Sequence, residues 1–256
     1  MLAALKKIFA KSESTETEYT EEFLDFSDVM VDMHSHVLPG LDDGSDSLEY
    51  SLGMVEEYIR FGYKKLIMTP HIMGDFYKNT PTGIRQKLKE LQNAVKAKGW
   101  DIELNCAAEY YLDEWFLKKL EDSEELLTFG DNYLLFETSF LNEPFNFKEA
   151  VFALRSNGYK PVLAHPERYT YLYGRFDDLL RMRDTGVLFQ ININSLIGYY
   201  SEGAKRVAEK LVDQKLVEFI GTDAHHNKHM DALVKTANTP YFKKVLDLPL
   251  RNKELL

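Results

Sequence analysis

The sequence contains one cysteine, Cys106, among its 256 residues, and it has no long apolar run. A single cysteine excludes an intramolecular disulfide and a metal site built from several thiolates. No stretch approaches the roughly 20 apolar residues that a membrane-spanning helix needs, so we expect no stable membrane insertion. The first residues also lack the pattern of a signal peptide, and the expected compartment is the cytoplasm.

Positive charge is scarce as well. The chain carries 31 Lys and Arg against 41 Asp and Glu, which gives a formal net charge of -10. Broad nucleic-acid binding usually needs a basic surface, so this balance argues against a nucleic-acid partner. The sequence also lacks G-x-S-x-G, Walker and G-x-G-x-x-G motifs, which removes the usual serine-hydrolase, P-loop and dinucleotide-binding signatures.

Two parts of the chain differ in composition. Residues 1–28 form an N-terminal extension, in which an amphipathic stretch with Leu2, Leu5 and Ile8 precedes a tether rich in Ser, Thr and Glu. A frayed end, a helix docked on the rest of the protein and a weak membrane-surface or partner contact all agree with this pattern. Residues 29–256 show no linker and no internal repeat, and we predict one domain there.

From residue 29 onward, strand-like apolar segments alternate with helix-like segments. The predicted strands span residues 29–33, 65–69, 102–107, 133–136, 161–164, 187–193 and 217–221. The predicted helices span residues 46–61, 81–98, 114–121, 147–157, 176–185 and 202–214, the first of them capped by Asp46 with Glu49 three residues on. This alternation indicates an α/β fold, either a barrel or a doubly wound sheet. We favour the barrel, because polar residues follow six of the seven strands and a barrel gathers all of those ends.

Histidine and carboxylate residues are concentrated at these strand ends. His34 and His36 are two residues apart, so their side chains point the same way, and Asp223 and His225 form a second pair. Further candidates are the pair Asp42 and Asp43, and then His71, Glu109, Glu137 and His165.

Taken singly, each candidate has another explanation. An H-x-H pair arises by chance on surfaces, a histidine can sit in a core, and a carboxylate after a strand often caps a helix or forms an ion pair. Packing does not explain five of the seven histidines and four carboxylates at successive strand ends, so together they predict a metal site. Nine ligands imply two or three ions, and imidazole with carboxylate but no thiolate suits Mn, Fe or Zn more than Ca or Mg.

The motifs resemble those of a known superfamily. They are His34-Ser35-His36, Asp42-Asp43-Gly44, Thr69-Pro70-His71, Glu109-Tyr110-Tyr111, His165-Pro166-Glu167-Arg168-Tyr169, Gln190-Ile191-Asn192 and Thr222-Asp223-Ala224-His225. They resemble the PHP-superfamily metal-dependent phosphatases, and within it the bacterial tyrosine-protein phosphatases of capsule and exopolysaccharide loci (the CpsB/YwqE type). The resemblance covers residues 30–234, most of the chain.

The resemblance implies a distorted (β/α)7 TIM-like barrel with a three-metal site at the carboxyl ends of its strands. Manganese is the first choice, with iron, zinc or magnesium as alternatives. Asp32 would orient an imidazole from behind. By motif position, the implied ligands are His34, His36, Asp43, His71, Glu109, Glu137, His165, Asp223 and His225.

Phosphate-ester hydrolysis would follow from such a site. The hypothesis is that a hydroxide bridging two metals attacks phosphorus in line. Arg168, three residues after His165, would hold two phosphate oxygens through its planar fork, although a surface ion pair is the alternative. A cysteine nucleophile is excluded, because the arginine that such a loop needs six residues after Cys106 is replaced by Leu112. We expect Cys106 to be a small, buried hydrophobic residue.

Several residues are candidates for contacting the substrate. Phe76 and Tyr77 follow His71 and would wall the pocket, with ordinary loop packing as the alternative. Lys228 stands where the family often carries an arginine, and it would take over phosphate binding on that side. The amides at 190, 192 and 194 are two residues apart, so they would line the barrel interior by the site or satisfy buried backbone.

The implied substrate is a phosphotyrosine protein, and the family analogy points to the tyrosine-rich tail of a bacterial polysaccharide-assembly kinase. Three alternatives stay open: a small-molecule phosphomonoesterase of the histidinol-phosphatase type, a metal-dependent nuclease or phosphodiesterase, and a non-enzymatic metal-stabilised scaffold in polysaccharide assembly. The sequence leaves the oligomeric state open.

Overall fold

Short strands alternate with helices through the part of the chain that the structure describes. This computed structural model describes residues 26–256, so nearly all of the predicted N-terminal extension lies outside the described residues. The strands are β1 (Val31–Asp32), β2 (Lys65–Met68), β3 (His71–Ile72), β4 (Glu103–Cys106), β5 (Glu109–Tyr111), β6 (Tyr133–Glu137), β7 (Lys160–Ala164), β8 (Leu188–Asn192) and β9 (Phe219–Gly221).

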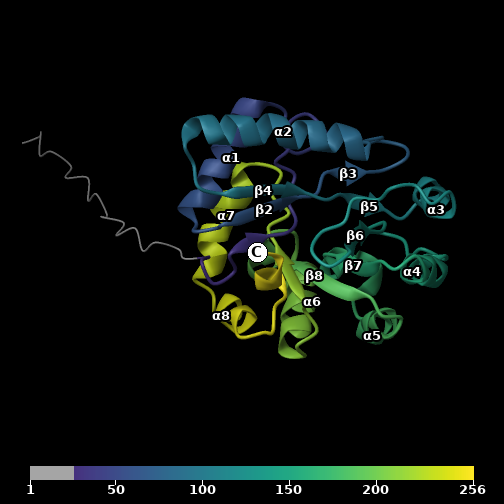
Figure 1. Cartoon of the computed structure of the whole chain (residues 1–256). Helices are drawn as coiled ribbons and strands as arrows, with labels where there is room; N and C mark the ends of the chain where they lie inside the picture. Colours follow the sequence, from purple (N-terminus) through teal and green to yellow (C-terminus); the bar gives the residue numbers. More distant parts are fainter. Residues whose placement is uncertain (1–25) are drawn as a thin grey trace, which may run out of the picture.

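Helices surround these strands (Figure 1). Capping residues set the ends of these helices. At the start of the helix over Pro81–Lys98, the Thr80 hydroxyl accepts from the Gly83 N–H, and Gly99 ends this helix with a left-handed φ of 70°. The α-helices of the described chain are α1 (Leu48–Arg60), α2 (Pro81–Lys98), α3 (Glu114–Glu121), α4 (Phe147–Ser156), α5 (Phe176–Asp184), α6 (Glu202–Asp213), α7 (Asn227–Ala237) and α8 (Pro240–Leu246).

All strand pairs are parallel and follow the chain order, as in a barrel. Two of the seven predicted strands, 65–69 and 102–107, correspond to β2 and β4, and each is followed after a short break by a further strand, β3 or β5, beyond the predicted bounds. The neighbours stay paired across the break, because the Ala107 N–H donates to the Met68 carbonyl and the Glu109 N–H donates to the Pro70 carbonyl. The predicted seven-strand alternation is therefore confirmed, with an interruption that the sequence did not reveal.

The first and last strands meet at both ends of the curled sheet. At the carboxyl end, Ser35 and Ala224 form a parallel bridge. At the other end, the buried side chain of Asn252 substitutes for missing strand pairing. Its Nδ2 donates to the carbonyls of Val31 at 3.0 Å and Ile220 at 2.8 Å, and its Oδ1 accepts from the Ile220 N–H at 3.0 Å.

Apolar side chains fill the barrel interior beneath the carboxyl ends of the strands. The Phe219 ring packs edge to face against Phe129 and Tyr133 there, and Leu255 from the C-terminal segment joins the same cluster. A larger apolar layer separates the strands from the outer helices. Because the interior is closed by packing, the polar strand ends are the accessible part of the barrel.

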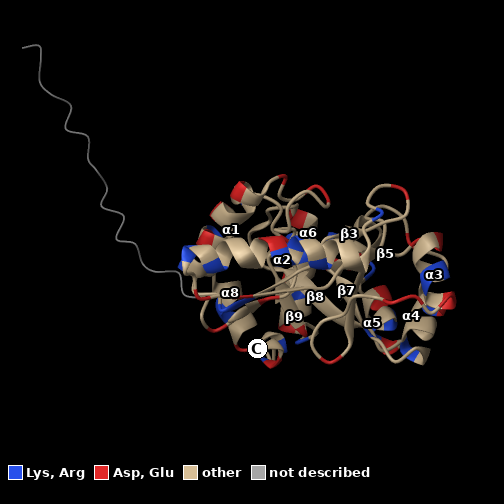
Figure 2. Ribbon diagram, turned by 45° about the horizontal axis from the view of Figure 1, so that its top comes forward, with Lys and Arg blue, Asp and Glu red and all other residues tan. Residues whose placement is uncertain are grey.

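Two helix predictions need correction. The first helix was predicted to be capped by Asp46, but Ser47 is the cap, because its hydroxyl accepts from the Tyr50 N–H at 3.3 Å. No helix was predicted after residue 214, yet α7 and α8 follow β9. Figure 2 shows acidic and basic residues interspersed along the ribbon of the outer helices.

The role of Asn252 in joining β1 to β9 predicts a stability effect. Asn252→Ala would leave three buried backbone groups without partners, which should lower the free energy of unfolding by about 2–4 kcal/mol. Asn238→Ala is the matched control, because that amide is exposed and bonds only to the Val234 carbonyl within its own helix. Urea denaturation of both variants measures the difference, and equal stability would contradict the role given to Asn252.

Candidate metal centre

The carboxyl ends of the strands bring all nine predicted ligands into one cluster. His34 and His36 follow β1, His71 begins β3, Glu109 begins β5 and Glu137 ends β6. His165 follows β7, and Asp223 and His225 follow β9. Asp43 enters from the loop between β1 and α1. Residues spread over almost two hundred positions therefore meet because parallel strands end at one face of the barrel (Figure 1).

Glu109 lies at the centre of the cluster. Its Oε2 is 3.1 Å from His71 Nδ1, 3.2 Å from His34 Nε2 and 3.4 Å from His36 Nε2. Its Oε1 is 3.0 Å from His165 Nε2. A single carboxylate that faces four imidazoles through both oxygens would help to hold more than one cation.

Four overlapping groups of side chains have ligand atoms within 4.8 Å of one another. Every predicted ligand belongs to at least one group. The groups are His36, Asp43, His71 and His225; His34, His36 and Asp223; His34, Glu109 and His165; and His71, Glu109 and Glu137.

Three of the imidazoles are oriented from behind, through Nδ1. His36 Nδ1 lies 2.7 Å from Asp42 Oδ2, His225 Nδ1 lies 2.9 Å from the Asp223 carbonyl oxygen, and His34 Nδ1 lies 2.8 Å from Gln190 Oε1. With Nδ1 donating to these acceptors, the lone pair of each ring is on Nε2. A bound metal needs such a lone pair on a neutral imidazole.

The buried carboxylates repel one another. Glu109, Glu137 and Asp223 are each at most 5% exposed. Burial, together with the negative charges of Glu109 and Asp223, raises the pKa of Glu137 well above its usual range. Burial and the Arg168 guanidinium lower the pKa of His165 to about 4, which keeps that imidazole neutral. A divalent cation among these groups would relieve the repulsion between the carboxylates.

Two facing atoms in the cluster lack hydrogen-bond partners. His71 Nδ1 and Glu109 Oε2 are buried and 3.1 Å apart, but their geometry is not that of a hydrogen bond. Buried polar atoms are almost always paired, so unpaired atoms that face each other need a reason. A cation between them supplies one, and a donor set of imidazoles and carboxylates suits it. The residues present therefore fit a divalent-metal site.

The backbone around the cluster is unusually tight. His165 and Asp223 have left-handed φ values of 35° and 50°, a conformation that costs energy outside glycine and is often found at functional sites. Gly44 lies so close to His36 that a Cβ would come within 2.1 Å of the His36 carbonyl oxygen. At Gly221 a Cβ would lie 2.6 Å from His34 Cβ. Only glycine lets these segments approach the two histidines.

Arg168 lies beside the cluster, as the sequence analysis expected. Its Nη1 donates to Asp223 Oδ2 at 2.7 Å, and its side chain is 23% exposed. The guanidinium carbon is 4.6 Å from the ring centre of Phe140 and 4.2 Å from that of Tyr200. The two rings hold the charged group in place by cation–π contact. Neither ring was predicted from the sequence, since both come from loops that only the fold brings to Arg168.

The other three residues predicted to contact the substrate lie at different distances from the cluster. The Tyr77 ring stacks on His71 with 5.6 Å between ring centres, so it forms part of the wall of the cluster. Phe76 is 73% exposed and has no ring contact among the described residues. Lys228 is exposed in the first turn of α7, and no contact in the described chain joins it to the nine residues. Its role stays a prediction.

One expected orienting residue is wrong, and another was missed. Asp32 does not orient an imidazole: its carboxylate accepts from the Thr222 N–H at 2.8 Å and from the Tyr58 hydroxyl at 2.9 Å. Asp42 does orient one, although only its neighbour Asp43 was given a role in the predicted site. The adjacent pair Asp42 and Asp43 was the available clue, since one carboxylate can bind a metal while the other supports a histidine.

The three amides expected near the site divide into two kinds. Gln190 bonds to His34, and Asn192 Nδ2 donates to Asp223 Oδ2 at 2.7 Å, so both face the cluster. Asn194 instead donates to the His229 carbonyl and accepts from the Thr236 hydroxyl. It therefore satisfies buried groups that do not belong to the nine predicted ligands.

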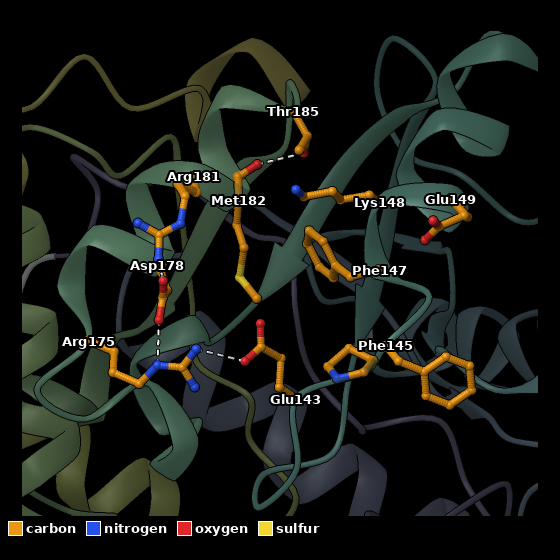
Figure 3. A pocket seen from close by; sticks show the side chains of 11 residues that line it. Glu143, Phe145, Phe147, Lys148, Glu149, Arg175, Asp178, Arg181, Met182 and Thr185 are labelled. Atoms are coloured by element: carbon orange, nitrogen blue, oxygen red, sulfur yellow. Dashed lines mark hydrogen bonds and ion pairs between the residues drawn. The ribbon is translucent and has the colours of Figure 1, made fainter.

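A separate surface hollow of about 530 Å³ lies between α4 and α5. Figure 3 shows Arg175 there between the carboxylates of Glu143 and Asp178. None of the nine clustered residues lines this hollow, and the residues that do line it include no histidine. It has no part in the candidate metal centre.

Comparison with known proteins places the chain in a family. Residues 30–247 match the family described as capsular polysaccharide synthesis, CpsB/CapC. The chain belongs to the CpsB/CapC family. This CpsB/CapC chain is 30% identical over 207 residues to tyrosine-protein phosphatase YwqE of Bacillus subtilis (strain 168), with 78% of both chains covered. It is 26% identical over 225 residues to tyrosine-protein phosphatase CpsB of Streptococcus pneumoniae, covering 86% of this chain and 89% of the relative.

Solved structures agree with this placement. One, described as YwqE from Bacillus subtilis and CpsB from Streptococcus pneumoniae, unique metal-dependent tyrosine phosphatases, matches with a TM-score of 0.74 and 27% identity over 87% of this chain and 95% of that chain. Histidinol phosphate phosphatase from Lactococcus lactis subsp. lactis shares the fold, with a TM-score of 0.53 and 14% identity over 82% of this chain and 94% of that chain. The predicted family and TIM-like α/β fold are confirmed. Within the described residues, no helix has the length and apolar character to cross a membrane.

The support that Asp42 gives to His36 predicts a loss of metal affinity. Asp42→Ala removes the acceptor for His36 Nδ1–H, which should weaken the binding of added Mn²⁺ by about 10- to 100-fold. Asp46→Ala, in the same loop but exposed and without contact to the cluster, should bind like the parent. Isothermal titration of metal-stripped protein measures both, with circular dichroism to verify folding. Unchanged affinity in folded Asp42→Ala would rule out the orienting role.

Proposed function

We propose that this CpsB/CapC chain is a metal-dependent tyrosine-protein phosphatase. The observation that carries the proposal is the convergence of nine imidazole and carboxylate side chains at one end of the barrel, with Arg168 beside them. Relatives that share most of the chain's length are named tyrosine-protein phosphatases. The catalytic unit in this proposal is residues 29–256.

The cluster would hold three divalent ions. The four overlapping ligand groups contain nine side chains, enough for two or three ions, and the resemblance to the PHP-superfamily phosphatases favours three. Manganese suits a mixed imidazole and carboxylate site without thiolates, and iron, zinc or magnesium are the alternatives. When bound, such ions supply Lewis acidity toward phosphate oxygens and lower the pKa of water.

Arg168 would hold the phosphate of the substrate. Its Nη1 is engaged with Asp223, and no other hydrogen bond from its guanidinium is seen in the described chain. The remaining N–H groups are therefore available to two phosphate oxygens, in the bidentate arrangement that a planar guanidinium favours. The rings of Phe140 and Tyr200 keep the guanidinium from swinging away.

Aromatic side chains around the cluster would receive the tyrosine ring. Phe140 lies 5.6 Å from the His165 ring and also faces Arg168, and Tyr77 covers His71 on the other side. Phe76 and Lys228, both exposed, would contact the substrate polypeptide farther out. Phenolate is a good leaving group because its conjugate acid has a pKa of about 10, so the reaction needs little help from a general acid.

The substrate would be a phosphotyrosine protein, and the family's link to capsular polysaccharide synthesis points to a bacterial tyrosine kinase of polysaccharide assembly. A tyrosine kinase uses ATP, so we propose that the phosphatase acts on the cytoplasmic side.

The metal requirement and the substrate class are tested together. Chelator-stripped protein should not hydrolyse a phosphotyrosine peptide, and added Mn²⁺ should restore turnover. Histidinol phosphate on the same preparation should be the poorer substrate. Metal-restored activity that prefers histidinol phosphate would move the function to a small-molecule phosphomonoesterase. No turnover of either substrate by metal-replete, folded protein would contradict an enzymatic function of this class.

Arg168 provides a second test. Arg168→Ala should lower kcat/KM for the phosphotyrosine peptide by about 10²- to 10³-fold, the usual cost of losing a donor to a charged reacting group. Arg168→Lys should recover only part of this loss, because lysine keeps the charge without the fork. Arg175→Ala, on an exposed arginine in ion pairs remote from the cluster, is the control. Metal content, measured by elemental analysis, should be unchanged in all three. Parental activity in Arg168→Ala would remove Arg168 from the phosphate site.

A further inference from the structure

Two buried amides on β8 connect two of the candidate ligands. Asn192 Nδ2 lies 2.7 Å from Asp223 Oδ2, Gln190 Nε2 lies 3.0 Å from Asn192 Oδ1, and Gln190 Oε1 lies 2.8 Å from His34 Nδ1. All four residues are at most 2% exposed. An unbroken chain of hydrogen bonds therefore joins Asp223 to His34, which belong to the same ligand group.

The donor and acceptor roles in this series of hydrogen bonds are fixed by the Asp223 carboxylate. An ionised carboxylate only accepts hydrogen bonds, so Asn192 must turn its NH₂ group toward Asp223 and its oxygen toward Gln190. Gln190 must then donate to Asn192 and turn its own oxygen toward His34. The proton of the His34 ring is consequently on Nδ1.

A second contact supports the same direction. The His165 backbone N–H, which can only donate, lies 3.3 Å from Gln190 Oε1. The atom of Gln190 that faces His34 is therefore the oxygen, whether the assignment starts from Asp223 or from His165. This agreement matters because the nitrogen and oxygen of an amide are otherwise assigned only from their surroundings.

At each end of this series of hydrogen bonds, one atom of a ligand remains free to face the cluster. At His34 the lone pair is left on Nε2, which lies 3.5 Å from Asp223 Oδ1. At Asp223, Oδ2 is occupied by Asn192 and by Arg168 Nη1, so Oδ1 remains, 3.4 Å from His36 Nε2. The same chain of hydrogen bonds thus selects the binding atom on two ligands that face each other.

We propose that Gln190 and Asn192 are positioning residues that act as one directional relay. The relay sets the tautomer of His34 and the free oxygen of Asp223 before a metal arrives, so the ion meets an organised site. The proposal rests on the metal centre of the proposed function, but not on its phosphotyrosine substrate.

The test compares three folded variants by two readouts that need no substrate. The first readout is the affinity of metal-stripped protein for Zn²⁺, by competition with a chelating dye. The second is the ¹⁵N chemical shift pattern of the His34 ring in the metal-stripped protein, which distinguishes Nδ1–H from Nε2–H. Gln190→Leu should weaken Zn²⁺ binding by about 10- to 100-fold, and His34 should no longer be held as Nδ1–H.

Asn192→Asp separates the two ends of the relay. It keeps the size of the side chain and the acceptor for Gln190, so His34 should stay Nδ1–H. It places a second carboxylate against Asp223 without a hydrogen to donate, so Zn²⁺ binding should still weaken. This variant also serves if Gln190→Leu does not fold.

Asn194→Leu is the matched control. Asn194 is equally buried and also loses two hydrogen bonds, but those go to the His229 carbonyl and the Thr236 hydroxyl, neither of which belongs to a predicted ligand. It should destabilise the fold while Zn²⁺ affinity and the His34 pattern stay parental. Parental affinity in both relay variants, an equal loss in Asn194→Leu, or an Nε2–H proton on His34 in the parent would overturn the proposal. Failure of phosphotyrosine hydrolysis alone would leave these readouts unaffected.

Discussion

The structure depends on an electrostatic balance between five imidazoles and four carboxylates packed at one end of the barrel. Three of the carboxylates are nearly inaccessible to water, and burying charges of one sign together is costly unless opposite charges and hydrogen bonds compensate. Arg168 and the surrounding imidazoles compensate in part. The raised pKa of Glu137 and the unpaired atoms of His71 and Glu109 show that the compensation is incomplete. A divalent cation would supply the missing positive charge.

The fold makes this balance possible because it supplies ligands and their supports from different strands. The bridge between Ser35 and Ala224 holds the β1 and β9 ligands side by side, while the Asn252 amide joins the same strands at the opposite end. Gly44 and Gly221 let neighbouring backbone approach the two β1 histidines. β8 supplies no ligand, but its amides face the ligands of its neighbours. A list of the ligands alone would therefore leave out the residues that hold them in position.

Much of this could be read from the sequence, because strand ends, short chelating pairs and the alternation of strands and helices are local patterns. The nine clustered side chains and the seven-strand order were predictable for that reason. The supports were harder, since they depend on contacts between distant segments. Asp32 lies beside the His34 motif but bonds to Thr222, 190 positions away. Side chains two residues apart on a strand share one face, so Gln190 and Asn192 both reach the cluster. β8 ends at Asn192, however, and Asn194 lies in the 3₁₀ helix that follows, so its side chain points in another direction.

The central claim is that these nine side chains are organised to bind divalent ions. The most direct measurement is anomalous X-ray scattering at the manganese edge from crystals of the Mn²⁺-loaded protein. The account predicts three anomalous peaks among the side chains of the cluster, one of them between His34, His36 and Asp223. An absence of peaks there in Mn²⁺-loaded crystals, or peaks only elsewhere on the protein, would contradict it.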